Sequence, residues 1–137
     1  MAYMDLLGIR LEAAGPERVE ASMPVTPELC QPFGYLHGGA TISLLETVAS
    51  VGAQERADLA TQRPFGVEVH VRHRKAARAG TVRGVAALES EEPSRSGALK
   101  QFWKVAAFDE QGDVVSDGVV VTKIVDLDHL ARRQAGR

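Results

Sequence analysis

Residues 38–54 constrain the fold of this chain more than any other part of its sequence. They contain no proline and one formal charge, Glu46, although a quarter of all residues in the chain are charged. Their apolar residues do not alternate, which indicates a helix rather than a strand. A helix that is apolar nearly all round must be buried on more than one side. We therefore expect a sheet that curls around this helix, a second subunit that covers it, or both.

The segments on either side of this predicted helix alternate between apolar and polar residues, which is typical of half-buried strands. Two such runs precede the helix, at 9–13 and 19–23, and four follow it, at 65–74, 81–89, 98–108 and 114–125. Short turns between successive strands predict an antiparallel sheet. The predicted fold class is α+β, with one long central helix, an antiparallel sheet of five to six strands and a short lead-in helix at 2–7.

Length and composition limit the class of protein. With 137 residues, 45% of them apolar, residues 1–125 can form one globular domain, and the polar tail 126–137 is expected to fray. A net charge of −2 without a basic block argues against a nucleic-acid partner. No apolar run approaches the roughly 20 residues that a membrane span needs. A single cysteine, Cys30, and an N-terminus without a secretory signal indicate a cytoplasmic protein.

Two candidate functional groups lie in the predicted helix. A lone carboxylate such as Glu46 in an apolar helix costs several kcal/mol unless it is paired or protonated. Glu46 is therefore either a functional group or a structural residue at a subunit boundary. The helix begins at His37-Gly38-Gly39 without Ser, Thr, Asp or Asn as a cap, so its first N–H groups have no obvious side-chain acceptor. They could hold an anion or an oxyanion, unless Gly38 is simply a tolerated cap.

The spacing of these two groups has a consequence for the site. Gly38 and Glu46 are eight residues apart, about 12 Å along a helix axis. A carbonyl held at the Gly38 N–H is therefore out of reach of Glu46 in the same chain. Two such helices packed antiparallel would bring each glutamate to the N-terminus of the other helix, so a site that uses both residues would be shared between two subunits.

No metal site or cofactor is predicted from the sequence. His70 and His73 lie three residues apart on a predicted strand and so point to opposite faces, which argues against a shared metal ion. His73, Arg74 and Lys75 form a small basic cluster. It is either a solvated strand end or a clamp for a phosphate group.

The segment 31–50, QPFGYLHGGATISLLETVAS, resembles the active-site helix of hotdog-fold acyl-CoA thioesterases. The similar branch includes the Arthrobacter-type 4-hydroxybenzoyl-CoA, the PaaI-like and the 1,4-dihydroxy-2-naphthoyl-CoA thioesterases. The resemblance continues through 66–68, His73, 80–84, 101–103 and 108–112. It implies a hotdog fold, in which an antiparallel sheet wraps one long helix, and a homodimer that pairs into a tetramer.

The resemblance also implies an activity and roles for residues. The activity would be hydrolysis of an acyl-CoA, with an aryl or arylacetyl group rather than a long chain, and with no cofactor besides the coenzyme A of the substrate. Glu46 would be the catalytic carboxylate, as nucleophile or as general base, and the Gly38 N–H would polarise the thioester carbonyl. Gln31 and His37 would lie beside the thioester, and Ser50 would steady the carboxylate or the water.

Contacts with coenzyme A are implied at Gly66 and at the run His73-Arg74-Lys75-Ala76. Relatives often have a Gly-Ser-Arg turn before the strand that carries the tryptophan, where this chain has Gly97-Ala98-Leu99-Lys100. Arg95 or Lys100 would then replace the missing arginine. Two alternatives remain: a non-catalytic acyl-CoA-binding or sensing protein on the same fold, and a hotdog dehydratase. The dehydratase would need an Asp–His pair, and the helix and the loop before it contain no matching Asp.

Overall fold

The structure, a computed structural model, describes residues 2–95 and 97–135. Its strands form one antiparallel sheet in the order β1-β2-β4-β5-β6-β3. The elements are α1 (Ala2–Leu7), β1 (Arg10–Ala14), β2 (Arg18–Pro24), the 3-10 helix η1 (Pro27–Leu29), α2 (Gly38–Arg56), β3 (Gln62–His73), β4 (Thr81–Pro93), β5 (Leu99–Phe108), β6 (Val114–Asp126) and α3 (Leu127–Ala135). The predicted α+β class and the hotdog arrangement are confirmed, with six strands.

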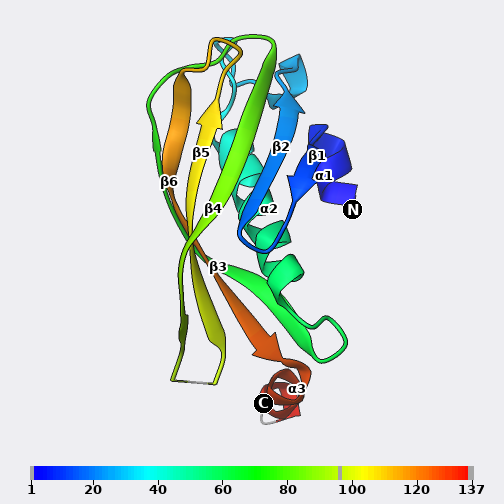
Figure 1. Cartoon of the computed structure of the whole chain (residues 1–137). Helices are drawn as coiled ribbons and strands as arrows, with labels where there is room; N and C mark the ends of the chain where they lie inside the picture. The colour runs from blue at the N-terminus through cyan, green and yellow to red at the C-terminus, as the bar shows by residue number, and fades with distance from the viewer. Residues whose placement is uncertain (1, 96, 136–137) are drawn as a thin grey trace.

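The long helix α2 lies along one face of this sheet (Figure 1). Leu44, Leu45 and Val48 are fully buried between the helix and the sheet. Burying each such side chain contributes about 1.5–3 kcal/mol, so this face of α2 is a main source of stability. Gly52 lets the helix approach Trp103 of β5 closely, because a Cβ atom at position 52 would lie 2.4 Å from the indole ring.

The opposite side of α2 is not covered by the sheet. Ile42, Ser43, Thr47 and Ser50 are only partly buried, and Glu46 is exposed. Part of this outer side is covered by α1, whose residues Met4 and Leu7 pack against the core. The expectation of a helix buried on more than one side is thus met only in part within one chain, and Glu46 in particular is not buried by its own subunit.

The C-terminal end of α2 is held by a chain of polar side chains. The Arg56 guanidinium donates two hydrogen bonds to the Glu91 carboxylate, at 2.9 and 3.1 Å, and a third to the Pro16 carbonyl oxygen. Glu91 also accepts from Gln101, whose side-chain oxygen accepts from the Thr122 hydroxyl. These bonds join the end of the helix to β4, β5, β6 and the β1–β2 turn.

Two polar segments differ from expectation. The strand predicted at 81–89 is too short, because β4 continues to Pro93 and pairs there with Leu99 in a hairpin at the far end of the sheet (Figure 1). The tail expected to fray forms α3 over Leu127–Ala135, and residues 136–137 lie outside the described residues. Within the described part of the chain, no helix is long and apolar enough to cross a membrane.

Candidate active site

The N-terminus of α2 is capped in a way that the sequence did not suggest. The His37 ring nitrogen Nδ1 accepts a hydrogen bond from the Gly39 N–H at 2.8 Å. The expectation that no side chain caps this helix is therefore wrong, because a histidine takes the place of the usual Ser, Thr, Asp or Asn. Among residues 2–95 and 97–135, the Gly38 N–H has no hydrogen-bond acceptor. The resemblance gives the Gly38 N–H the role of donor to the thioester oxygen, and His37 binds the neighbouring Gly39 N–H and not this one.

A cleft of about 410 Å³ opens beside this helix N-terminus. His73, at the end of β3, forms one wall: its Nδ1 lies 2.7 Å from the Ser116 hydroxyl oxygen, and its Nε2 would lie 2.6 Å from a Cβ atom at Gly38. Gln31 forms another wall, and its side-chain oxygen accepts from the Phe33 N–H, which leaves its NH2 group as a donor. The cleft brings together six predicted site residues: Gln31, Gly38, His73, Arg74, Lys75 and Ala76.

The two cations of this cleft are already paired with carboxylates. Arg74 Nε lies 2.8 Å from an Asp117 oxygen, and Lys75 Nζ lies 2.6 Å from Asp109 and 2.7 Å from Asp113. The hydrogen bonds to Asp109 and then to Asp113 raise the pKa of Lys75, and the hydrogen bond from Lys75 lowers the pKa of Asp109. An anionic ligand at this cleft would therefore share these cations with three aspartates.

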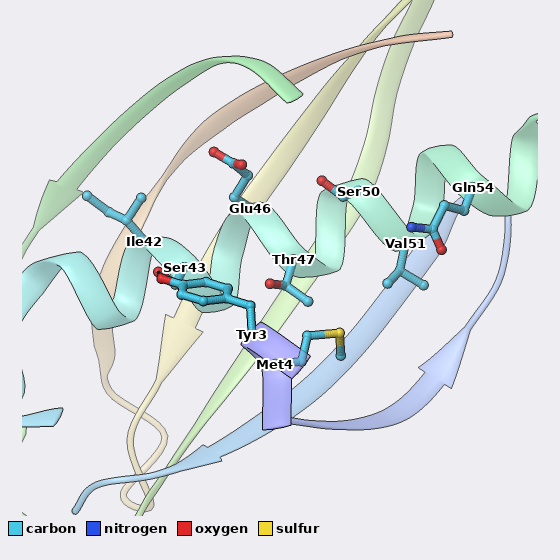
Figure 2. A pocket seen from close by; sticks show the side chains of 9 residues that line it. All are labelled: Tyr3, Met4, Ile42, Ser43, Glu46, Thr47, Ser50, Val51 and Gln54. Carbon is cyan, nitrogen blue, oxygen red and sulfur yellow. Dashed lines mark hydrogen bonds between the residues drawn. The ribbon is translucent and has the colours of Figure 1, made fainter. Parts of the chain in front are cut away.

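Glu46 lies at a second pocket, on the outer side of α2. This pocket has a volume of about 400 Å³ and is formed by α2 together with Tyr3 and Met4 of α1. In Figure 2 the Glu46 side chain projects away from α2, and Ser50 lies about one turn further along the helix. Glu46 and Ser50 form no hydrogen bond with each other in the single chain. Gly66 of β3 lies against the carboxylate, since a Cβ atom there would be 3.3 Å from Oε2.

Arg95 and Lys100 line neither of these pockets. Arg95 is in the β4–β5 turn, at the end of the sheet away from the start of α2 (Figure 1). Lys100 Nζ lies 3.8 Å from a Glu68 oxygen and 5.1 Å from the centre of the Phe102 ring. Within one chain, the structure does not bring these two cations to the residues of the His73 cleft.

Sequence reasoning missed the residues that α1 contributes. The Tyr3 hydroxyl oxygen lies 2.7 Å from Ser43 Oγ, although the two residues are forty positions apart. It also missed the carboxylates Asp109, Asp113 and Asp117, which pair with the predicted cations. No local pattern indicates such long-range contacts. The one sequence feature that could have indicated the contact with Ser43 was Tyr3 itself, an aromatic residue in the predicted helix 2–7.

The sequence and the fold are similar to those of known thioesterases. A family model described as Thioesterase superfamily matches residues 33–116. The 1,4-dihydroxy-2-naphthoyl-CoA hydrolase of Escherichia coli strain K12 is 37% identical over 122 residues, which are 89% of this chain and 85% of that protein. The proofreading thioesterase EntH of Cronobacter turicensis is 38% identical over 112 residues, 80% of this chain and 75% of its own. A crystal structure of a mutant thioesterase from Pseudomonas aeruginosa superposes with a TM-score of 0.82 at 32% identity, covering 91% of this chain and 86% of that one.

Proposed function

The chain belongs to the thioesterase superfamily, and on that premise we propose that it hydrolyses an acyl-CoA thioester to the free acid and coenzyme A, in a site that two copies of the chain share. The observation that carries this proposal is the placement of the two key groups. The Gly38 N–H and the Glu46 carboxylate belong to one helix but lie at different pockets. They are about 12 Å apart along the helix axis, too far to act on one carbonyl.

A second copy of the chain removes this separation. The outer side of α2 is covered only in part, by α1, and β3 is an edge strand, so β3 and the uncovered part of α2 are available for contact with another copy. In a two-fold dimer the same surface patch meets itself. Two α2 helices that pack antiparallel bring Glu46 of one copy toward Gly38 of the other. The exposed carboxylate of the single chain is then covered by the second subunit.

The chemistry requires one donor and one carboxylate. The Gly38 N–H donates to the thioester oxygen and stabilises the negative charge that develops there, an effect typically worth about 3–4 kcal/mol of barrier. Glu46 acts in one of two ways. As a general base it takes a proton from a water molecule that attacks the carbonyl carbon. As a nucleophile it forms a mixed anhydride that water then hydrolyses. In both routes the C–S bond breaks and the thiolate of coenzyme A leaves and takes up a proton.

The remaining predicted residues have positioning and binding roles. Gln31 and His37 stand beside the helix N-terminus and would orient the thioester, and Ser50 would steady the carboxylate or the water. The cleft formed by Gln31 and the run 73–76 would receive part of coenzyme A. An aryl or arylacetyl group is the proposed acyl moiety. Support comes from the size of the pocket at Glu46, about 400 Å³, and from the E. coli relative, which is named for an aryl-CoA substrate.

Replacing Glu46 tests the proposal directly. We expect Glu46→Ala and Glu46→Gln to reduce kcat/KM for benzoyl-CoA and phenylacetyl-CoA by about 10²–10⁴-fold, since a positioned acid–base group typically contributes that much. The release of free thiol measures turnover. The matched control is Glu55→Gln, which removes an exposed carboxylate from the same helix outside the pocket and is expected to keep wild-type activity. Undiminished turnover in both Glu46 variants would remove this residue from the mechanism.

The same assay separates the proposal from its rival. A non-catalytic acyl-CoA-binding protein on this fold would bind benzoyl-CoA, as calorimetry would detect, but the wild-type chain would release no thiol. The chain has both a Gly38 N–H without an acceptor and an accessible Glu46 carboxylate, and this combination favours an enzyme over a protein that only binds acyl-CoA.

A further inference from the structure

The short helix α1 is fixed to the outer side of α2 by a directed chain of hydrogen bonds. The Ser43 hydroxyl donates to the Gly39 carbonyl oxygen at 3.0 Å. A serine hydroxyl has one proton, so the 2.7 Å contact between Ser43 and Tyr3 must be donated by the tyrosine hydroxyl. Below this bond, Met4 packs against the hydrophobic core. Tyr3 and Met4 are thus held in place rather than projecting freely.

These two side chains close one side of the pocket that contains Glu46. Figure 2 shows Tyr3 and Met4 on one flank of α2, facing Ser43, Thr47 and Val51, with Glu46 and Ser50 on the other flank. The pocket extends from one flank to the other. Near α1 the lining combines Met4, Val51 and the Tyr3 ring with the hydroxyls of Ser43 and Thr47, whereas the carboxylate is at the opposite side.

We propose that α1 is the far wall of the acyl-group site, and that Tyr3 and Met4 determine which acyl groups the enzyme accepts. This inference rests on the proposed function, because it takes Glu46 as the residue that meets the reacting carbon. The acyl group then begins at Glu46 and extends across α2 toward α1. A pocket of about 400 Å³ is at the small end of the roughly 300–1,000 Å³ range of ligand sites. A single aromatic ring fits this space, but a long straight chain meets Tyr3 and Met4.

Truncation of the wall tests this inference. We expect Met4→Ala and Tyr3→Ala to raise the ratio of kcat/KM for lauroyl-CoA to kcat/KM for benzoyl-CoA by at least about tenfold, since a few methylene groups are worth that much discrimination. The matched control is Leu6→Ala, on the same helix but 81% exposed and outside the pocket, which is expected to leave the ratio unchanged. A change in stability alone would alter both substrates together and would not move the ratio.

A third variant, Tyr3→Phe, keeps the ring and removes only the hydrogen bond to Ser43, so it tests the wall even if Met4→Ala unfolds α1. We expect it to shift the same ratio in the same direction. The inference is overturned if Tyr3→Ala, Tyr3→Phe and folded Met4→Ala all keep the wild-type ratio within twofold. That result is distinguishable from failure of the proposed function, in which the wild-type chain itself hydrolyses none of the thioesters.

Discussion

Gly38 begins α2 directly against the imidazole of His73, and a methyl group at this position would lie 2.6 Å from Nε2. The His73 ring has little freedom to move away from Gly38, because its Nδ1 forms a hydrogen bond with the Ser116 hydroxyl of β6. Gly38 also lines the cleft, and its N–H is the donor at the start of α2 that His37 does not bind. Glycine at this position therefore allows the close packing against His73 beside that backbone donor.

We expect Gly38→Ala to lower kcat/KM for benzoyl-CoA by about 10²-fold or more, since it displaces the donor aimed at the developing oxyanion. Thermal unfolding is expected to show a loss of about 1–2 kcal/mol from overpacking. In Gly38→Ala/His73→Ala this loss of stability should be smaller, because the ring that clashes is absent. Gly15→Ala is the control, since its Cβ atom would make only an ordinary 3.6 Å contact. An active Gly38→Ala enzyme would contradict the role of this donor.

Single residues were predictable from the sequence where they broke a local pattern. Glu46 stood out as the one charge in an apolar helix, and Gly38 as a glycine where a capping residue was expected. The cap formed by His37 was not predictable, because histidine is rarely preferred there and its ring orientation is set by the surrounding loop. The pairing of Arg74 and Lys75 with aspartates was missed because the aspartates lie in the β5–β6 turn and in β6, which are distant in sequence.

At the scale of elements, α2 is anchored at its C-terminal end by the ion pair of Arg56 with Glu91. Both side chains are about three-quarters buried, with exposed fractions of 22% and 25%. The hydrogen bonds from Arg56, followed by that from Gln101, lower the pKa of Glu91, although burial opposes this. A pair in such surroundings stabilises more than a fully exposed one, on the order of 1 kcal/mol.

This anchor predicts a pH dependence of stability. Since the pKa of Glu91 is lower in the folded chain, its stabilisation is fully present above the ordinary value of 4.5 and is lost as the pH falls through the folded pKa. We expect Glu91→Gln to unfold at a lower temperature than wild type at pH 7, with a difference that shrinks between pH 5 and pH 3. Glu92→Gln, at the neighbouring exposed position, is the control. A difference that stays constant over this range would show that Glu91 stabilises the fold by packing alone.

The elements that the sequence predicted correctly do not all have a buried face: β1 and α1 were predicted, although every residue of β1 is exposed and no residue of α1 is buried. Apolar alternation located β2, β4, β5 and β6 because each of these strands has buried residues, as with Val82 and Ala86 of β4. The extension of β4 to Pro93 was missed, because residues 89–93 lie beyond the apolar core and show no alternation of buried and exposed positions. The helix α3 was missed although Leu127, Leu130 and Ala131 stand at the helical spacing i, i+3 and i+4, because the segment is short and otherwise polar.

At the scale of the whole molecule, one chain presents two incomplete pockets. The cleft at Gly38 has a backbone donor and polar residues but no free carboxylate, because its aspartates are paired. The pocket at Glu46 has a carboxylate, and the N-terminus of α2 is not part of its lining. In the proposed dimer each copy would supply what the other lacks, which is the arrangement that the spacing of the two groups along α2 predicts.

A shared site predicts that two inactive variants restore each other. In a mixed dimer of Glu46→Ala with Gly38→Ala, one of the two sites combines an intact Glu46 with an intact Gly38. Random exchange of subunits is expected to recover about a quarter of wild-type activity. The measurement is thiol release after the two proteins are mixed and allowed to exchange, with each variant alone as the control. If the mixture stays inactive while exchange is demonstrated, the two groups do not act in one site.

The paired cations beside His73 bear on how quickly an enzyme of this kind could turn over. A phosphate group that binds there replaces a carboxylate as the partner of Lys75 or Arg74, so the net gain in electrostatic attraction is small. If coenzyme A is the product bound there, as proposed, it would be held weakly and released readily, and the aspartates would pair again with Lys75 and Arg74.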